Sequence, residues 1–279
     1  AIKNHFMKIT IVAGARPNFM KIAPIIHAIQ KKQDEGKNIT FRLVHTGQHY
    51  DKNLSDSFFE ELNIPQPDVN FEVKSGTQAE QTAAIMVAFE KDLKQNPTNL
   101  VLVVGDVTST MACAIVAKKE GVDVAHVEAG IRSGDLSMPE EINRMVTDSI
   151  TDWFFTTSAY ANDNLKNLGI PNDRIFYVGN TMIDTLFQNL NKLKQPKVWD
   201  DLKLIPKQYF VLTLHRPSNV DETFQLQELI KLICGLSNDL PIVFPVHPRT
   251  KKMLDALNIE HANLHFVDPL GYLEFNYLV

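Results

Sequence analysis

Short apolar runs alternate with longer amphipathic runs along most of the chain. The short runs are rich in β-branched residues, which is typical of buried parallel strands. The longer runs repeat apolar residues at helical spacing, as Phe19, Ile22, Ala23, Ile26 and Ile29 do. This alternation predicts βαβ units and an α/β fold with parallel sheets. We expect strands at Lys8–Ala13, Phe41–His45, Val69–Val73, Leu100–Val104, Val122–Val127, Trp153–Thr156, Ile175–Val178, Tyr209–Leu214, Ile242–Val246 and Leu264–Val267.

Local signals predict where two of the helices begin. Thr77 and Glu80 have the spacing of a capping box, in which each side chain accepts a hydrogen bond from the other residue's backbone. Pro17 suits the first turn of a helix, because a proline there lacks only an N–H that would have no helical partner. Pro24 lies further along the same pattern, where we expect a kink.

A polar stretch bearing Lys, Pro and Asp interrupts the alternation and divides the chain. We expect a first Rossmann-like domain over residues 1–191, a linker over 192–207 and part of a second nucleotide-binding domain over 208–279. The second part holds about three expected strands, which is few for an open doubly wound sheet. We therefore interpret it as an incomplete domain and expect these 279 residues by themselves to lack the activity inferred below.

Composition narrows the classes of partner. The 279 residues are 44% hydrophobic and 22% charged, which is ordinary for a globular protein. The formal net charge of -5 offers no general basic field, so nucleic acid is not an expected partner. No apolar run is long enough to span a membrane and the first residues lack a secretory apolar region, so we expect a cytoplasmic protein without membrane contact.

The two cysteines do not indicate a metal or redox site. Cys113 and Cys234 lie far apart, each within a helical pattern, and neither belongs to a C-x-x-C pair. We expect both to be buried as small apolar side chains and expect no metal.

Acidic residues follow two of the predicted strands. Asp106 comes just after Leu100–Val104 and Glu128 just after Val122–Val127, at the carboxyl ends where open α/β sheets place their ligands. Asp106 could instead cap the following helix. Glu128 is harder to explain structurally, because a carboxylate buried at a strand end costs several kcal/mol unless it is paired.

A third acidic position begins another predicted helix. Glu140 follows Pro139, where the helix dipole favours an acid in any case, and Glu141 is the alternative candidate. Arg132 and Arg144 are candidate partners, one for a carboxylate and one for a substrate.

The turn after the first strand could bind an anion. It reads Gly14-Ala15-Arg16-Pro17-Asn18 and lacks the G-x-G-x-x-G fingerprint, so NAD binding is disfavoured. Free backbone N–H groups at the helix start, together with Arg16 and Lys21, would form an anion site. The alternative is a solvated arginine beside an ordinary turn.

Together these blocks resemble the non-hydrolysing UDP-N-acetylglucosamine 2-epimerases. The resemblance runs from near Met7 to the last residue and rests on several blocks in the family's order: Gly14-Ala15-Arg16-Pro17, Thr46-Gly47-Gln48-His49, Gly105-Asp106-Val107-Thr108, Glu128-Ala129-Gly130-Ile131-Arg132, Pro139-Glu140-Glu141-Ile142-Asn143-Arg144 and Leu214-His215-Arg216. It implies two Rossmann-like domains of the glycosyltransferase-B type and an isomerase that interconverts UDP-N-acetylglucosamine and UDP-N-acetylmannosamine for envelope polysaccharides. It also implies a homodimer and no cofactor.

The resemblance also assigns roles to individual residues. It implies catalytic roles for Asp106, Glu128, Glu140 and His215, and binding of the UDP-sugar by Arg16, Lys21, Arg132, Arg144 and Arg216. A second nucleotide-sugar site that regulates activity would use Gln48, His49, His247 and Arg249, although these could equally be ordinary loop residues. His126, inside a strand, is interpreted as a hydrogen-bonded core histidine.

Other functions stay open on sequence grounds. A hydrolysing epimerase or a glycosyltransferase of the same architecture would release UDP, whereas a non-hydrolysing epimerase conserves the UDP-sugar. A third interpretation is a nucleotide-sugar-binding fragment without turnover.

Overall fold

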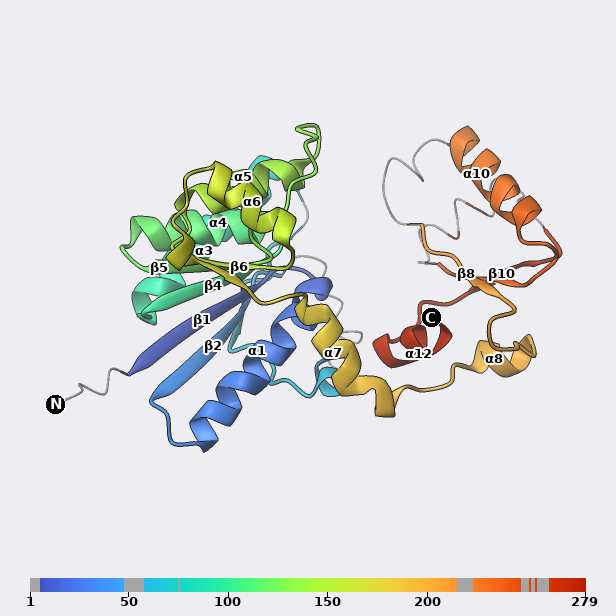
Figure 1. Cartoon of the computed structure of the whole chain (residues 1–279), viewed down its shortest axis with the longest axis horizontal. Coiled ribbons are helices and arrows are strands. Elements are labelled where there is room, and N and C mark those ends of the chain that lie inside the picture. Colours follow the sequence, from blue (N-terminus) through green and yellow to red (C-terminus); the bar gives the residue numbers. More distant parts are fainter. Residues whose placement is uncertain are drawn as a thin grey trace. The chain divides into compact units, whose positions relative to one another are not determined.

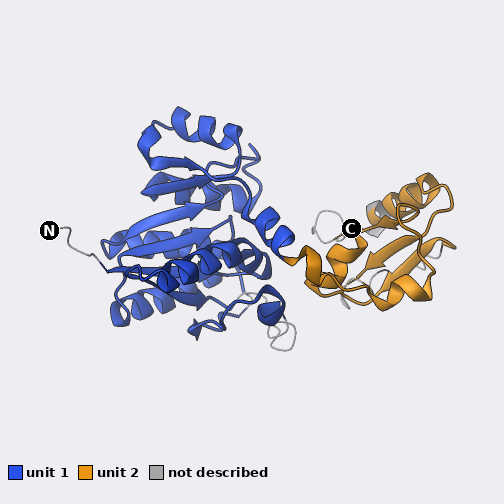
Figure 2. Ribbon diagram, turned by 60° about the horizontal axis from the view of Figure 1, so that its bottom comes forward, with its two compact units in different colours: residues 1–188 blue, residues 189–279 orange. Residues whose placement is uncertain are grey.

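The computed structural model of the chain describes residues 6–47, 58–74, 76–214, 223–246, 251, 254 and 261–279. The chain forms two compact units, residues 1–188 and 189–279 (Figure 2). The units divide close to the boundary that the sequence predicts at residue 191. Among the described residues, no helix is long and apolar enough to cross a membrane.

The first unit is built on a seven-stranded parallel sheet with the order β3-β2-β1-β4-β5-β6-β7 (Figure 1). The chain moves outward from β1 in one direction and then returns to add β4 on the other side of β1. The order therefore reverses between β1 and β4, which is a topological switch point. The strands are β1 (Met7–Ala13), β2 (Ile39–His45), β3 (Val69–Asn70), β4 (Leu100–Val104), β5 (Asp123–Val127), β6 (Trp153–Thr156) and β7 (Ile175–Tyr177).

Helices cover both faces of this sheet. One layer contains α3, α4, α5 and α6, and the other contains α1 and α7 (Figure 1). The bounds are α1 (Arg16–Asp34), α3 (Gln78–Gln95), α4 (Thr108–Lys119), α5 (Pro139–Ile150), α6 (Ala159–Asn167) and α7 (Thr181–Asn189), with a short 3₁₀ turn at η1 (Asn172–Arg174). A second 3₁₀ turn, η2 (Leu190–Lys192), follows in the second unit.

Apolar packing between α3, α4 and the sheet forms one cluster of the core. Val101 and Val103 of β4 pack with Phe89 of α3 and Cys113 of α4, all fully buried. Burial raises the pKa of the Cys113 thiol well above its ordinary value. Both cysteines are buried, as predicted.

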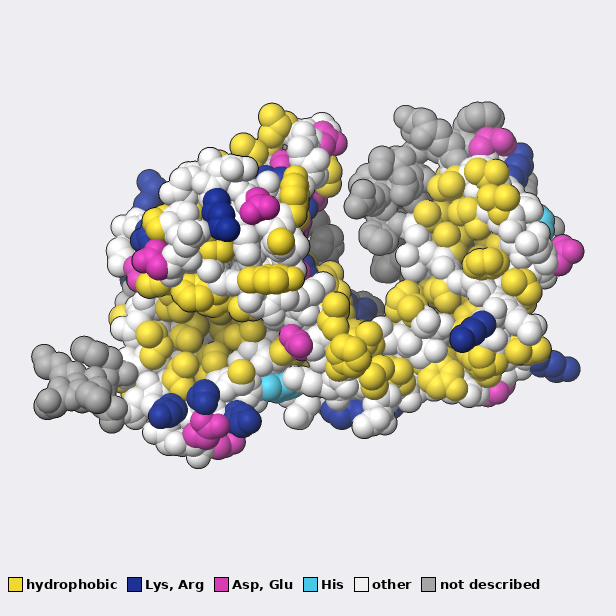
Figure 3. All heavy atoms as spheres, in the orientation of Figure 1, with side chains coloured by type: hydrophobic (Ala, Val, Ile, Leu, Met, Phe, Trp, Pro, Cys, Tyr) yellow, Lys and Arg dark blue, Asp and Glu magenta, His cyan; other side chains and the backbone are white. Residues whose placement is uncertain are grey.

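The opposite face of the sheet is less covered near β6 and β7. Phe154 of β6 is buried with Leu165 of α6, and because side chains alternate along a strand, its neighbour Trp153 points to the other face. There the rings of Trp153 and Phe176 form a tilted pair, and the two residues remain 38% and 40% exposed. Hydrophobic side chains also gather on the face of this unit that Figure 3 shows.

The predicted capping box is present, whereas one predicted strand is shorter than expected. Thr77 Oγ1 accepts from Glu80 N at 3.2 Å and Glu80 Oε2 accepts from Thr77 N at 2.8 Å, which confirms the box. The strand predicted over Val69–Val73 is shortened to β3 (Val69–Asn70) because Glu72 has a positive φ of 52°, which breaks the extended backbone.

The second unit contains a three-stranded parallel sheet with the order β10-β9-β8. Its strands are β8 (Phe210–Val211), β9 (Ile242–Pro245) and β10 (Leu264–Val267), and its helices are α8 (Lys197–Asp201), α10 (Thr223–Leu236) and α12 (Tyr272–Leu278). The strand predicted over Tyr209–Leu214 is reduced to β8, which among the described strands pairs with β9.

The segment expected as a linker, 192–207, is structured within the second unit. It contains α8, and Val198 and Leu204 are buried with Val243 of β9 and Leu278 of α12. Apolar residues spaced through this polar stretch explain why it packs instead of spanning open solvent. The α/β fold of two Rossmann-like units with parallel sheets is confirmed.

Candidate active site

The switch point brings three loops of the first unit to the same edge of the sheet. β1 pairs with β4 and β4 pairs with β5, all parallel, so the turns after these strands are neighbours. Arg16 follows β1, Asp106 follows β4 and Glu128 follows β5. Asp106 and Glu128 therefore follow adjacent parallel strands, as predicted from the apolar runs that precede them.

Glu128 forms an ion pair with Lys21 of α1. Lys21 Nζ lies 2.5 Å from Glu128 Oε2, and the two side chains are only 14% and 12% exposed. The backbone of Glu128 has a φ of 69°, a left-handed conformation that non-glycine residues rarely adopt. Strained backbone of this kind is concentrated at functional sites, where the surrounding structure holds it in place.

Gly105 makes room for this ion pair. Its φ is 71°, and a Cβ placed on it would lie 3.2 Å from Lys21 Nζ and 3.6 Å from Glu128 Oε2. A side chain there would be strained and would press on the lysine. The glycine thus lets the backbone of the β4 turn approach the Lys21–Glu128 pair closely.

Asp106 is held by groups from α5. Arg144 Nη2 lies 2.5 Å from Asp106 Oδ2, and Asn143 Nδ2 donates to the backbone carbonyl of Asp106 at 2.8 Å. The same guanidinium reaches Glu141 Oε2 through Nη1 at 2.8 Å. Arg144 therefore bridges two carboxylates with its two terminal nitrogens, which fixes the geometry of Asp106.

Glu141 is a fixed acceptor. It is buried and accepts from the backbone N–H groups of Ser133 at 2.9 Å and Gly134 at 3.1 Å. Burial by itself raises the pKa of Glu141, but the hydrogen bonds from Ser133, Arg144 and Gly134 outweigh it and lower the pKa to about 2. A carboxylate that stays ionised orients Arg144 and cannot supply a proton near neutral pH. Glu140, one residue earlier, is half-buried and forms no ion pair within the described part of the chain.

Arg132 is bound to a buried carboxylate. Its Nη1 lies 2.7 Å from Asp148 Oδ2 and also donates to the carbonyl of Ile131 at 2.7 Å. Its Nη2 is buried and has no hydrogen-bond partner among the described residues. Asp148 also contacts His126, whose two ring nitrogens both have partners, as predicted for a core histidine.

The turn after β1 differs from the predicted anion site. Asn18 Oδ1 accepts from the backbone N–H groups of Gly14 and Ala15, each at 3.0 Å, so these donors are not free for a ligand. Lys21 faces Glu128. The Arg16 guanidinium lies over the ring of Phe58 with 4.7 Å to the ring centroid, and burial lowers its pKa.

Several predicted site residues lie outside the described residues. They are His215 and Arg216 of the proposed diphosphate site, and Gln48, His49, His247 and Arg249 of the proposed regulatory site. Within the described ranges, no three His, Cys, Asp or Glu side chains come together in a way that would hold a metal ion.

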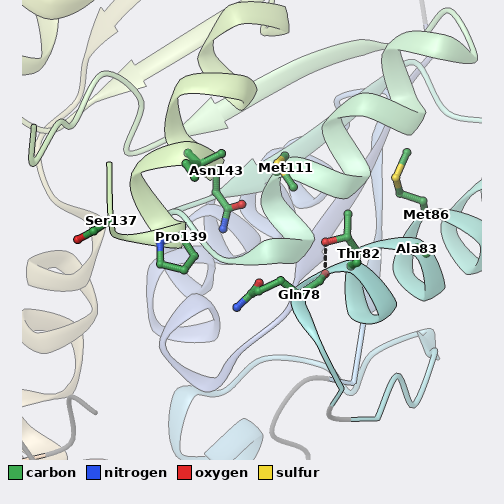
Figure 4. Close-up of a pocket in the computed structure, with 10 residues that line it drawn as sticks. Gln78, Thr82, Ala83, Met86, Met111, Ser137, Pro139 and Asn143 are labelled. Atoms are coloured by element: carbon green, nitrogen blue, oxygen red, sulfur yellow. Dashed lines mark hydrogen bonds between the residues drawn. The ribbon is translucent and has the colours of Figure 1, made fainter. Parts of the chain in front are cut away.

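A cavity of about 480 Å³ opens between α3, α4 and the start of α5. Pro139 and Asn143 of α5 face Gln78 and Thr82 of α3 across it, and Met111 of α4 closes one side (Figure 4). None of its lining residues is charged, and it does not include the two ion-paired carboxylates. The cavity therefore offers no cationic side chain to a diphosphate, and Asn143 links its wall to the Asp106 turn.

Sequence reasoning did not assign Asn18, Asn143 and Asp148 to the site. Asn18 and Asn143 lie inside the motif blocks, and that location could have indicated that they belong to the site. Asp148 carries no local signal, because its partners Arg132 and His126 are separated from it along the chain and meet it only in the fold.

A doubly wound parallel sheet with two cation-paired carboxylates at its switch point places the chain among α/β proteins of the Rossmann-like class. Within that class, the chain belongs to the UDP-N-acetylglucosamine 2-epimerase family, whose model matches residues 31–279.

Individual relatives agree with this assignment. The chain is 41% identical over 279 residues to a UDP-N-acetylglucosamine 2-epimerase of Methanocaldococcus jannaschii, covering 96% of this chain and 75% of the relative. It is 37% identical to a UDP-2,3-diacetamido-2,3-dideoxy-D-glucuronate 2-epimerase of Pseudomonas aeruginosa, with 98% and 75% covered. The crystal structure of the M. jannaschii enzyme with UDP-GlcNAc and UDP matches with a TM-score of 0.85 and 40% identity, covering 98% of this chain and 76% of that one.

Proposed function

We propose that this protein is a non-hydrolysing UDP-N-acetylglucosamine 2-epimerase, an isomerase that inverts the configuration at C2 of the sugar. The observation that carries the proposal is the pair of carboxylates at adjacent strand ends, Asp106 beside Arg144 and Glu128 beside Lys21. Family membership adds the substrate class, because relatives at about 40% identity are named for this reaction.

The chemistry explains why several carboxylates are needed. The C2 proton is not adjacent to a carbonyl, so its direct removal would be very slow. Departure of UDP from C1 creates positive charge there and acidifies the C2–H bond. A base then removes the proton, and the electron pair of that bond forms the C1–C2 double bond of a 2-acetamidoglucal. Return of UDP to C1 and of a proton to the other face of C2 gives the epimer.

We assign the proton transfers to Asp106, Glu128 and Glu140. Arg144 holds Asp106 in place and Lys21 holds Glu128, while Glu141 anchors Arg144 from its other side. Fixed groups of this kind reduce the reorganisation needed in the transition state.

We assign the departing diphosphate to cationic groups. Arg16, Arg132, His215 and Arg216 are the proposed contacts, with Gln48, His49, His247 and Arg249 as a second, regulatory nucleotide-sugar site. No redox cofactor or metal is needed for the proposed elimination and addition. A homodimer in the cytoplasm completes the proposal, and light scattering of the purified protein tests the dimer.

Product analysis of the full-length protein tests this function. UDP-N-acetylglucosamine is supplied and the products are separated by chromatography with mass detection. We expect UDP-N-acetylmannosamine to appear while the summed amount of the two UDP-sugars stays constant. Free UDP should not accumulate. Free UDP in proportion to released sugar would instead identify a hydrolysing epimerase, and a glycosyltransferase would release UDP only with an acceptor.

The P. aeruginosa relative is named for a different sugar, so the substrate panel includes a UDP-linked diacetamido uronic acid. We expect higher kcat/KM with UDP-N-acetylglucosamine. The opposite preference would support the same 2-epimerisation reaction but assign a different sugar as the substrate.

A further inference from the structure

Two turns of the candidate active site are joined by one buried pair of side chains. His126 of β5 and Asp148 of α5 are both almost completely inaccessible to solvent. Their contact joins His126 Nδ1 to Asp148 Oδ1 at 2.7 Å. Neither residue is among those assigned to the proposed reaction.

His126 contacts the turn that carries Asp106. Its Nε2 lies 2.8 Å from the backbone carbonyl oxygen of Gly105, the residue immediately before Asp106. A carbonyl oxygen only accepts, so Nε2 donates this hydrogen bond. On the other side of the ring, Nδ1 and Asp148 Oδ1 share the 2.7 Å hydrogen bond given above.

Asp148 contacts the turn that carries Glu128. Its Oδ2 accepts from the backbone N–H of Gly130 at 3.0 Å and lies 2.7 Å from Arg132 Nη1. Burial raises the pKa of Asp148, but the hydrogen bond from His126 and the charge of Arg132 outweigh burial and lower it. An unbroken chain of hydrogen bonds therefore runs from the carbonyl of Gly105 to the amide of Gly130.

A purely structural role does not explain this arrangement well. Buried charged groups are rarely more stabilising than apolar residues that fill the same volume. The pair lies next to left-handed backbone: Gly105 and Gly130, at φ values of 71° and 78°, adopt this conformation readily, whereas Glu128, at 69°, is strained. Strained turns persist only when their surroundings fix them.

We propose that His126 and Asp148 are positioning residues, which fix the Asp106 turn relative to the Glu128 turn. Neither touches the reacting atoms. Their effect on catalysis rests on the proposed 2-epimerase function, whereas their effect on the two turns does not.

The test compares Asp148→Asn with a matched control, Asp152→Asn. Asp152 lies near the other end of β5, where its Oδ2 likewise accepts from a backbone N–H, that of Val124 at 2.8 Å, and pairs with a cation, Lys118 Nζ, at 2.8 Å. Both substitutions remove one carboxylate charge and keep the side-chain shape. Only Asp148 contacts the site turns.

Hydrogen exchange measured by mass spectrometry reports the stability of the two turns and does not depend on enzyme activity. We expect exchange in peptides covering 105–107 and 128–131 to rise roughly tenfold in Asp148→Asn and to stay unchanged in Asp152→Asn. His126→Gln, which keeps fewer hydrogen bonds, should also accelerate exchange in both peptides. This variant replaces Asp148→Asn in the test if Asp148→Asn does not fold. Unchanged exchange in both peptides, or the same increase in the control, would overturn the proposal.

Kinetics then tests the catalytic consequence in the full-length protein. We expect Asp148→Asn to lower kcat about 10- to 100-fold with little change in KM, because displaced catalytic groups slow the chemical step. Asp152→Asn should retain wild-type kcat. Equal kcat in the two variants would contradict positioning, whereas a wild-type protein without turnover would contradict the proposed function and leave the exchange result to decide the positioning role.

Discussion

Lys21 and Glu128 form a close ion pair across 107 positions of sequence, with 2.5 Å between Nζ and Oε2. The contact joins α1 to the turn after β5, across the point where the strand order reverses. It shields most of both charges from water, so each depends on the other.

Replacing Lys21 by Met should strongly impair both stability and turnover. The variant leaves the Glu128 carboxylate buried without its cation, which costs about 3 kcal/mol of unfolding free energy when one partner of a buried pair is removed. Turnover should fall on the order of 100-fold, because the carboxylate loses its fixed position. Chemical denaturation and a UDP-sugar assay measure the two effects.

The control for Lys21→Met is Lys31→Met on the exposed side of the same helix. It should change unfolding free energy by no more than about 0.5 kcal/mol and leave turnover intact. Similar losses in the two variants would mean that the ion pair has no special role.

Arg144 should act on Asp106 through its forked geometry. Arg144→Lys keeps the charge but cannot bridge Glu141 and Asp106 with two nitrogens at once. We expect a double-mutant cycle of Arg144→Lys and Asp106→Asn, measured on kcat/KM, to give a coupling of about 1–3 kcal/mol. Additive effects would show that the two residues act independently.

Gly105 and Gly121 have nearly the same backbone conformation, so substitutions at the two positions distinguish backbone strain from steric crowding by a new side chain. Gly105 and Gly121 have φ values of 71° and 74°, but only Gly105 would place a Cβ near other atoms, 3.2 Å from Lys21 Nζ. Substitution by Ala should cost about 1–2 kcal/mol of unfolding free energy at either position. Only Gly105→Ala should also reduce turnover. Full activity in Gly105→Ala would show that the close approach to Lys21 is unnecessary.

His45 should make stability depend on pH. Burial lowers the pKa of His45 to about 4, and Gly47 N donates to its Nδ1 at 2.8 Å, so the folded protein favours the neutral ring. An unfolded histidine has a pKa near 6.5. Stability from this group is therefore complete above pH 6.5 and is lost as pH falls toward 4, by up to about 3 kcal/mol.

Denaturant titrations between pH 7 and 4 measure this dependence. His45→Asn should flatten the decline relative to the wild type over that interval. An unchanged slope would assign the acid sensitivity to other groups.

The sequence predicts the fold best where one segment carries its own signal. The strand Leu100–Val104 matches β4 residue for residue, since its apolar run is buried on both faces. The strand predicted over Val69–Val73 is too long because the left-handed backbone of Glu72 leaves no trace in hydrophobicity. Likewise, the segment 192–207 was predicted to be a linker because its polar residues obscured the apolar positions that pack in the second unit.

The candidate site was predictable only as a set of residue positions. Strand ends located Asp106 and Glu128, because parallel strands that are neighbours share an edge. The partners were not predictable: no spacing rule joins Lys21 to Glu128, and the free N–H groups expected after β1 are occupied by Asn18. Contacts between distant segments are decided by packing, which a single sequence does not display.

Proton exchange at C2 tests the central claim most directly. The full-length wild-type protein, Asp106→Asn and Glu128→Gln are incubated with UDP-N-acetylglucosamine in D₂O, and deuterium at C2 is followed by NMR or mass spectrometry. We predict that the wild type incorporates deuterium and that each variant does so about 10²–10⁴-fold more slowly, with little change in substrate affinity, because these carboxylates act mainly in the transition state. Deuterium incorporation at the wild-type rate in either variant would show that the substituted carboxylate does not exchange the C2 proton and would contradict the account.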